Sequence, residues 1–348
     1  MRERLHWGVI GTGGIASDFA EALDSSERCR IVNVVGSSLP KARAFADRFR
    51  VPKAASTLSD LLADPAVEAV YIATPHPSHE AQALASIEAG KHVLCEKPLT
   101  IDAASTARVI EAARRRGVFL MEAFMYRCHP LMRDLVPRLQ DGVIGALRHV
   151  RADFAFRVPR VADGRLFNPE LAGGGILDVG GYPVSFARLL AGLVERRPFA
   201  EPVKVDAVGV IGPTGVDEFT TALLTFGSGF TAAVTAGVYH DSGRTAVIFG
   251  EDGKIVIADP WIPGSDRHGL ETGYTILRDG QKPETVAVRA TQATYAIEAE
   301  FVADTLPSNE APWPAMGWDD TLGNMRALDA WRAALLAGSQ GARSSRNL

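Results

Sequence analysis

Cysteine is scarce in this 348-residue chain, and no two cysteines have the CxxC spacing of a metal or redox site. The three that occur, Cys29, Cys95 and Cys128, are an odd number. This count argues against a disulfide framework and against a structural zinc site. We therefore expect a reducing, cytoplasmic location.

The chain also lacks an excess of charge of one sign and a long apolar run. Its formal net charge is −4, with both signs spread along the sequence. No basic field is therefore available to hold a nucleic acid or an anionic membrane. No window approaches eighteen uninterrupted apolar residues, and no signal peptide is predicted. We expect small-molecule partners, with neither a nucleic acid nor a membrane among them.

What the sequence does have is a regular alternation of apolar runs and helical spacing in its first third. Six alternations, from residue 6 to residue 121, are typical of a doubly wound parallel sheet, the Rossmann arrangement. After Glu122, six β-branched and aromatic runs between residues 148 and 257 follow one another across short turns. This pattern predicts a large open sheet that is mainly antiparallel.

The length of the chain and its 47% hydrophobic content allow two cores. We expect an α/β Rossmann domain at 1–122 and an α+β domain for substrate binding and oligomerisation at 123–348. Helical spacing in the second half predicts helices at about 183–190, 293–306 and 319–336.

A glycine-rich turn follows the first apolar run. Its residues are Gly11, Thr12, Gly13, Gly14, Ile15 and Ala16, with alanine in the third glycine place of the dinucleotide fingerprint. Gly11 permits the tight turn, Gly13 lets a pyrophosphate approach the backbone, and the helix that starts near Ile15 offers free amides to phosphates. An ordinary glycine turn is the alternative, but its place after the first of six strands favours a dinucleotide site.

The end of the second predicted strand bears on the choice between NAD and NADP. An acid there binds the ribose hydroxyls of NAD, and a basic residue accommodates the phosphate of NADP. The chain has Ser37 and Ser38 and no acid, with Lys41 or Arg43 able to supply charge from the following helix. We favour NADP over NAD, although two turn serines beside solvated basic residues would give the same pattern.

Lys97 lies between Glu96 and Pro98, directly after the predicted strand 92–95. Open α/β sheets bind ligands at the carboxyl ends of their strands, so this lysine is a candidate for chemistry. The alternative is a surface lysine paired with Glu96.

The segment 173–183 places Asp178 and Tyr182 four residues apart at the start of a predicted helix. Tyrosine, with a pKa of about 10, needs roughly 4 kcal/mol of help to titrate near neutrality. An ammonium group about 5 Å away, at an effective dielectric constant of about 20, supplies roughly 3 kcal/mol. Lys97 and Tyr182 therefore form a workable acid/base couple if the fold brings them together, with Tyr182 close to the positive end of the helix. Asp178 would orient the lysine or the substrate, or it would cap the helix.

Together these motifs resemble the Gfo/Idh/MocA family of oxidoreductases over nearly the whole chain. The resemblance rests on the glycine turn, Ala73-Thr74-Pro75 with His79, Glu96-Lys97-Pro98, the stretch 121–127 with His129-Pro130, and the segment 173–183. It implies an N-terminal Rossmann domain, a C-terminal open sheet that often forms the oligomer contact, and Lys97 as the catalytic lysine. The cofactor contacts outside the glycine turn would include Ser37, Ser38, Lys41, Thr74, Pro75, His79, Glu96, Lys97 and Arg127.

Tyr182, where many family members have histidine, is similar to one branch of the family. That branch contains dimeric dihydrodiol dehydrogenase, NADP-linked D-xylose dehydrogenase and glucose-fructose oxidoreductase. It commonly has an arginine just after the second strand, where this chain has Ser37-Ser38, so the resemblance leaves NADP and NAD open. Arg165 and Asn168 also resemble the branch and are candidate substrate or cofactor contacts; a loop arginine and an N-capping asparagine are the alternative.

His76 and His79 have an HxxH spacing, but no helical carboxylate of the HExxH kind accompanies them, so we expect no metal site.

We therefore expect an NAD(P)-dependent dehydrogenase that acts on a hydroxyl or carbonyl carbon of a sugar, cyclic polyol or dihydrodiol. Tyr182 would be the general acid/base, and Lys97 would lower its pKa. An NAD-retaining glycoside hydrolase and a non-catalytic sugar- or dinucleotide-sensing regulator on the same fold are the alternatives. The open sheet needs its outer face covered, so we expect a homodimer or homotetramer through this sheet.

Overall fold

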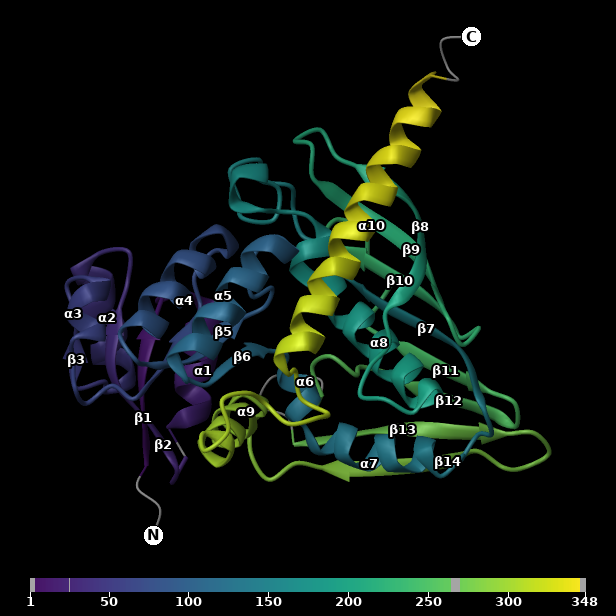
Figure 1. The fold of residues 1–348 in the computed structure, drawn as a ribbon, viewed down its shortest axis with the longest axis horizontal. Helices are drawn as coiled ribbons and strands as arrows, with labels where there is room; N and C mark the ends of the chain where they lie inside the picture. Colours follow the sequence, from purple (N-terminus) through teal and green to yellow (C-terminus); the bar gives the residue numbers. More distant parts are fainter. Residues whose placement is uncertain (1–3, 25, 264–269, 345–348) are drawn as a thin grey trace.

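The computed structural model describes residues 4–24, 26–263 and 270–344, which form two β-sheets with their covering helices (Figure 1). The first sheet has the strand order β3-β2-β1-β4-β5-β6 and is parallel throughout. Its strands are β1 (Leu5–Ile10), β2 (Cys29–Val35), β3 (Lys53–Ala54), β4 (Ala69–Ile72), β5 (His92–Glu96) and β6 (Leu120–Ala123). The order reverses between β1 and β4, as in a Rossmann sheet, so the predicted doubly wound arrangement is confirmed.

Five helices connect these strands: α1 (Gly14–Leu23), α2 (Leu39–Phe49), α3 (Leu58–Leu62), α4 (His79–Glu88) and α5 (Ala103–Arg116). Local sequence defines where several of them begin. Thr57 and Asp60 form a capping box at α3, in which each side chain accepts a hydrogen bond from the other residue's backbone amide. Asp102 caps α5 by accepting from the Ser105 amide at 2.7 Å. Every residue of β4 is buried, as expected for a central parallel strand.

The second sheet has eight strands in the order β14-β13-β12-β11-β7-β10-β9-β8. They are β7 (Leu147–Ala155), β8 (Pro202–Ile211), β9 (Asp217–Phe226), β10 (Thr231–Gly237), β11 (Ala246–Gly250), β12 (Gly253–Ile257), β13 (Glu271–Arg278) and β14 (Glu284–Arg289). Among the described strands of this sheet, the β7–β10 pair alone is parallel, so the predicted mainly antiparallel sheet is confirmed. Sequence analysis missed β13 and β14, because polar residues alternate with apolar ones in these strands near the edge and weaken the apolar signal.

The helices of the second half are α6 (Met125–Cys128), α7 (Pro130–Gln140), α8 (Gly181–Glu195), α9 (Thr294–Thr305) and α10 (Trp318–Ser344). Helix α7 was not predicted, and α10 continues beyond its expected end at residue 336. A π-helix, η3 (Ile176–Gly180), runs directly into α8 through Gly180 and Gly181, both with right-handed helical angles. Tyr182 is the second residue of α8, as expected, but the π-helix places the positive end of the continuous helical segment more than a turn earlier. Because the helix dipole acts mainly within the first turn, its effect on Tyr182 is smaller than expected.

Helices α7, α8 and α10 pack on one face of the eight-stranded sheet, and α10 crosses it as a long diagonal rod (Figure 1). The stretch Pro169–Glu195 has the length and apolar composition of a membrane span, but 94% of its most apolar window is buried inside the protein. It is therefore explained as a core helix of this layer.

Helix α9 returns to the Rossmann half of the molecule. Its residues Tyr295, Ala296 and Ala299 are buried in the same apolar core as Trp7 of β1 and Phe19 of α1. Phe19 also lies 6.4 Å from Tyr295, measured between ring centroids. The C-terminal part of the chain thus completes the core of the first sheet.

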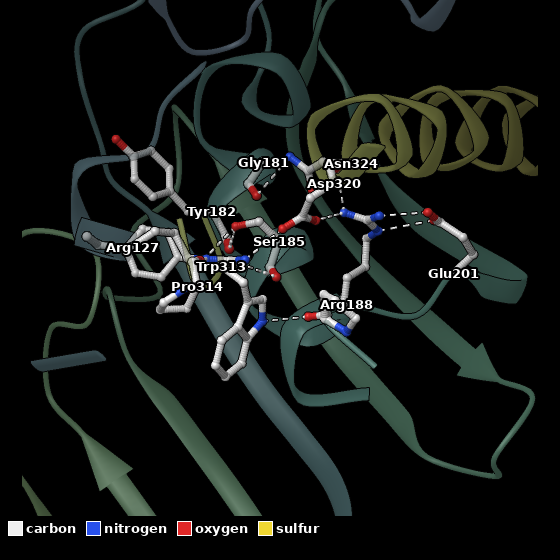
Figure 2. Close-up of polar contacts among 12 residues, drawn as sticks. Arg127, Gly181, Tyr182, Ser185, Arg188, Glu201, Trp313, Pro314, Asp320 and Asn324 are labelled. Carbon is white, nitrogen blue, oxygen red and sulfur yellow. Dashed lines mark hydrogen bonds and ion pairs between the residues drawn. The ribbon is translucent and has the colours of Figure 1, made fainter. Parts of the chain in front are cut away.

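A buried ionic network fastens α6, α8 and α10 together (Figure 2). Asp320 of α10 accepts from Arg127 of α6 at 2.7 Å and from Arg188 of α8 at 2.5 Å. Both arginine side chains are 0% exposed, and that of Asp320 is 4% exposed. Arg188 also donates two hydrogen bonds to Glu201. Three helices from distant parts of the sequence therefore depend on one carboxylate.

Replacing Asp320 by alanine should lower the free energy of unfolding by about 3–5 kcal/mol, because it leaves the buried Arg127 guanidinium without a carboxylate and Arg188 with Glu201 alone. Chemical denaturation measures this loss. The exposed neighbour Asp319 provides the matched control, and Asp319→Ala should cost less than about 1 kcal/mol. Equal losses for the two variants would contradict this account of the network.

Candidate active site

Two adjoining cavities lie along the carboxyl ends of the Rossmann strands. The first, of about 370 Å³, is lined by residues of both halves of the chain, including Lys97 and Tyr182. The second, of about 600 Å³, extends over the glycine turn toward α2. Both are lined by Gly13 and by Ala73, Thr74 and Pro75, so they form one continuous groove at the switch point of the sheet.

The glycine turn has the shape that a dinucleotide requires. Gly11 has a φ of +117°, and a Cβ atom there would lie 2.5 Å from the Ala73 carbonyl oxygen. A Cβ at Gly13 or Gly14 would meet no atom within 4 Å, so both positions open onto the groove. Helix α1 starts at Gly14, and no side chain caps its first amides. These free amides and the open backbone fit the pyrophosphate of a dinucleotide.

The end of the groove near α2 contains the residues expected to select the cofactor. Ser37 and Lys41 line the second cavity, as does Arg48, which sequence analysis missed. The Arg48 guanidinium is 2.7 Å from Glu21 Oε1 and 4.6 Å from the centroid of the Phe49 ring. Its seven-residue spacing from Lys41 places both on one helix face, a signal that the sequence already contained.

Lys97 and Tyr182 meet in the first cavity, as the proposed couple requires. The Lys97 Nζ atom lies 5.4 Å from the centroid of the Tyr182 ring. The same ammonium donates a hydrogen bond of 2.7 Å to the Asp178 carbonyl oxygen. Lys97 comes from the Rossmann sheet, whereas Asp178 and Tyr182 come from η3 and α8. The site therefore exists only where the two halves of the chain meet.

Asp178 links two cations within this cavity. Its Oδ1 atom accepts from Arg165 at 2.8 Å and lies 3.9 Å from Lys97 Nζ. Burial by itself would raise the pKa of Asp178, but Lys97 and Arg165 outweigh burial and hold the pKa below its usual value. Asp178 is therefore ionised at neutral pH and orients both cations.

Two histidines stand beside the couple. His79 is fully buried, and its ring nitrogens lie 2.9 Å from the Pro98 carbonyl oxygen and 2.8 Å from that of Thr74. It thus joins the end of β4 to the segment that carries Lys97. Burial lowers the pKa of His76 to about 3, so its ring is neutral at physiological pH. Within the described ranges, no cluster of three or more histidine, cysteine or acidic side chains could hold a metal ion.

Most predicted site residues line the groove, and the structure places four elsewhere. Those in the groove are Gly11, Thr12, Gly13, Gly14, Ile15, Ser37, Lys41, Thr74, Pro75, His79, Glu96, Lys97, Arg165, Asp178 and Tyr182. Ala16 is buried within α1, and Ser38 precedes α2 as its N-cap residue. The Asn168 side chain accepts from the Glu170 amide at 2.8 Å, which is the capping role left open above.

The expectation that Arg127 contacts the cofactor is wrong, because its side chain is buried away from the groove. Its guanidinium donates to the Ser185 carbonyl oxygen at 3.0 Å and to that of Pro314 at 2.5 Å, as well as to Asp320. The side chain is 0% exposed and lies in the layer between α6, α8 and α10 (Figure 2). The sequence places Arg127 just after a Rossmann strand, but it does not indicate which way the side chain turns.

Sequence analysis missed the apolar wall of the first cavity. This wall consists of Met125, Phe154, Phe156, Ile262 and Tyr295. The alternation of Phe154 and Phe156 along a predicted strand was a usable signal, because residues two apart face the same side. Ile262 and Tyr295 come from segments far along the chain, and no pattern in the sequence connects them to the site.

Two family models match this chain. Residues 5–124 match the one described as "Oxidoreductase family, NAD-binding Rossmann fold", and residues 132–256 match the "GFO/IDH/MocA C-terminal domain". The chain belongs to the Gfo/Idh/MocA family of oxidoreductases. The predicted family is therefore confirmed, and the protein is an NAD(P)-dependent oxidoreductase with its dinucleotide site in the Rossmann half.

Individual family members extend the comparison. The chain is 39% identical over 264 residues to trans-1,2-dihydrobenzene-1,2-diol dehydrogenase from Mus musculus, covering 74% of this chain and 76% of that one. The 3-ketoreductase KijD10 from Actinomadura kijaniata, solved with NADP and TDP-benzene, has a TM-score of 0.83 at 28% identity over 96% of this chain and 98% of that one. An aldose-aldose oxidoreductase from Caulobacter crescentus shares the fold, with a TM-score of 0.84 at 23% identity over 97% and 98% of the two chains.

Proposed function

We propose that this family member transfers a hydride between NADP and a carbon that bears a hydroxyl or carbonyl group in a sugar, cyclic polyol or dihydrodiol. The observation that carries the proposal is the Lys97 ammonium 5.4 Å from the Tyr182 ring, in the cavity at the end of the glycine groove. The names of the mouse dihydrodiol dehydrogenase and the bacterial 3-ketoreductase support this substrate class.

The chain's own residues supply the proton chemistry. During oxidation, the Tyr182 phenolate would accept the proton of the substrate hydroxyl, and during reduction the phenol would return it. The Lys97 ammonium favours the phenolate, because opposite charges a few ångströms apart attract. The Asp178 carbonyl oxygen holds the ammonium in place, and Arg165 in turn binds the Asp178 carboxylate. A bound nicotinamide would supply or take up the hydride.

The shape of the cavity suits a ring-shaped substrate. Phe154, Phe156 and Ile262 form an apolar wall, while Lys97, Tyr182 and Arg165 provide polar groups. A flat or gently puckered ring against the apolar wall would present its hydroxyl to Tyr182. This division favours a cyclic diol or sugar over an open-chain acid.

NADP is the proposed cofactor because of the cation at the α2 end of the groove. Lys41 and Ser37 line that cavity, and the carboxylate of Glu21 nearby is paired with Arg48. A phosphate on the adenosine ribose would find an ammonium and a hydroxyl there. KijD10 has been solved with NADP, which supports the same choice.

Lys41→Met should weaken NADPH binding by about ten- to a hundred-fold, because a hydrogen bond to a charged group is worth about 1.5–3 kcal/mol. NADH binding should change less than about threefold. Titration of nicotinamide fluorescence measures both constants. Arg43→Met is the matched control, since Arg43 is an exposed base on the same helix that does not line the groove. Equal losses for NADPH and NADH would contradict the phosphate site.

Tyr182→Phe should lower turnover by about a hundred- to ten-thousand-fold and leave NADPH affinity unchanged, because it removes only the acid/base. The assay follows nicotinamide absorbance with trans-1,2-dihydrobenzene-1,2-diol, aldoses and polyols, each with NAD and NADP. A loss of less than about threefold in a folded variant would overturn the assignment.

The same assay separates the rival functions. Hydrolysis without net change in nicotinamide absorbance would indicate the glycoside hydrolase. Bound cofactor without turnover across the panel would indicate the sensor.

We also propose that a second copy of the chain covers the open face of the eight-stranded sheet. Val208 and Val210 of β8 and Leu223 of β9 are 73%, 49% and 45% exposed on the face opposite α8 and α10. Their neighbours there are mostly threonines and apolar residues, a composition that suits a self-complementary dimer contact.

Light scattering coupled to size exclusion should give at least a dimer, and Val208→Glu should shift it toward monomer because it buries a charge in the contact. Val161→Glu, at an apolar position 57% exposed in a loop, is the matched control and should leave the assembly unchanged. A monomeric parent protein would contradict the proposal.

We infer that the chain divides into domains at 1–122 and 123–348, with α9 returning to complete the first. The end of β6 at Ala123 and the separate apolar cores support this division.

A cytoplasmic location is proposed as well. Cys29, Cys95 and Cys128 are all free and buried, which suits a reducing compartment.

A further inference from the structure

We propose that Tyr126 and Arg127 of α6 are positioning residues that hold Tyr182 at its working distance from Lys97. The inference deepens the proposed function and rests on it, because it takes Tyr182 as the acid/base. Neither α6 residue reaches the groove: Tyr126 is 0% and Arg127 1% exposed, and neither lines either cavity. They act instead on the backbone that carries Tyr182.

The first contact is a relay of two hydroxyl groups. The Ser185 hydroxyl donates to the Tyr182 carbonyl oxygen at 2.9 Å. The Tyr126 hydroxyl lies 2.7 Å from the same Ser185 oxygen. A serine hydroxyl has one proton to donate, and that proton is committed to Tyr182, so Tyr126 is the donor in the second bond. The Tyr126 hydroxyl therefore orients the Ser185 hydroxyl, which in turn is hydrogen-bonded to the Tyr182 carbonyl oxygen.

Two further donors hold the same helical turn. Arg127 donates to the Ser185 carbonyl oxygen at 3.0 Å, and Asn324 of α10 donates to that of Gly181 at 3.4 Å. Figure 2 shows these groups gathered around the backbone of this turn, while the Tyr182 ring points away from the arginines. Three carbonyl groups within one turn thus receive side-chain hydrogen bonds, a density that rigidifies the turn beyond ordinary helix bonding.

Helix α6 also connects the turn of Tyr182 to the strand that leads to Lys97. Lys97 directly follows β5, and Glu96 of β5 pairs with Ala123 of β6. After β6, only Phe124 precedes the start of α6 at Met125. Strand β5, which leads to Lys97, is therefore hydrogen-bonded to β6, and β6 leads directly into α6, the helix that binds the turn of Tyr182. Such a path of rigid elements sets a distance more sharply than a loop would.

The ring contacts of Tyr126 allow its hydroxyl group to be removed without changing how the ring packs. The rings of Tyr126 and Tyr182 lie 5.9 Å apart, and that of Tyr126 lies 5.5 Å from Trp261. Tyr126→Phe keeps these ring contacts and removes only the hydrogen-bond donor. A small displacement of a reacting group can cost up to about a hundred-fold in rate, so loosening of the turn should be measurable in turnover.

The effect should also appear in the pH profile. Other charged or titratable groups that line the cavity are Glu96, Lys97, Arg165, Asp178, His76, His79 and Tyr295. None of them is changed in the variants. A Tyr182 phenol held farther from Lys97 would need a higher pH to ionise, so the rising limb of kcat for oxidation should move to higher pH.

The experiment compares Tyr126→Phe, Ser185→Ala and the double variant with the parent enzyme. The probe is trans-1,2-dihydrobenzene-1,2-diol with NADP, or the best substrate of the panel described above. Each single variant should lower kcat by about tenfold and move the rising limb by at least about half a pH unit, with KM and NADPH affinity within about threefold. The double variant should lose no more than the larger single loss, because both changes break one relay.

Tyr274→Phe is the matched control, because Tyr274 is a buried tyrosine of β13 whose hydroxyl donates to Asp134, away from the groove. It should leave kcat and the pH profile unchanged. A Tyr126→Phe enzyme with kcat within twofold of the parent would overturn the inference. So would a loss of kcat without movement of the pH limb, because that result indicates a merely structural role. If Tyr182→Phe itself retained activity, the proposed function would fail first, and the two failures are thus distinguished.

Discussion

The hydrogen bond from the Lys97 ammonium to the Asp178 carbonyl is the contact on which the candidate site depends. It joins the end of a Rossmann strand to the π-helix of the second half. The first half supplies Lys97 and the second half supplies Tyr182, so the acid/base couple needs both halves. π-Helical turns are rare and often occur at functional sites, because they displace side chains from the ordinary helical register. Here the turn carries Asp178 and leads directly to Tyr182.

Charge balance in the site follows from that contact. Lys97 and Arg165 would repel each other in a confined cavity, and the Asp178 carboxylate between them makes the arrangement stable. The pKa of Asp178 stays below its usual value because both cations outweigh its burial. The neutral His76 adds no further positive charge. The cavity can therefore hold the Lys97 ammonium beside the Tyr182 phenol, because the Asp178 carboxylate offsets part of the positive charge of Lys97 and Arg165.

A second buried carboxylate, that of Asp320, stabilises the helices that carry the site. Asp320 binds Arg127 and Arg188, and Arg127 in turn reaches the turn of Tyr182. Helix α9 adds a separate connection by completing the Rossmann core. The two sheets are thus joined both by a hydrogen-bonded network and by a packed helix. That construction explains how residues 85 positions apart along the chain, Lys97 and Tyr182, are held together.

The sequence by itself determined the periodic features: the parallel sheet, the glycine turn, the second open sheet and the positions of Lys97, Asp178 and Tyr182. These follow from local patterns, because apolar spacing and glycine geometry act within a few residues. Only the tertiary structure decided that Arg127 faces the interior, that Asn168 caps a turn, that Tyr182 lies inside a continuous helix, and that Ile262 and Tyr295 complete the cavity. The direction of a side chain and the meeting of distant segments depend on packing between elements, which no local pattern encodes.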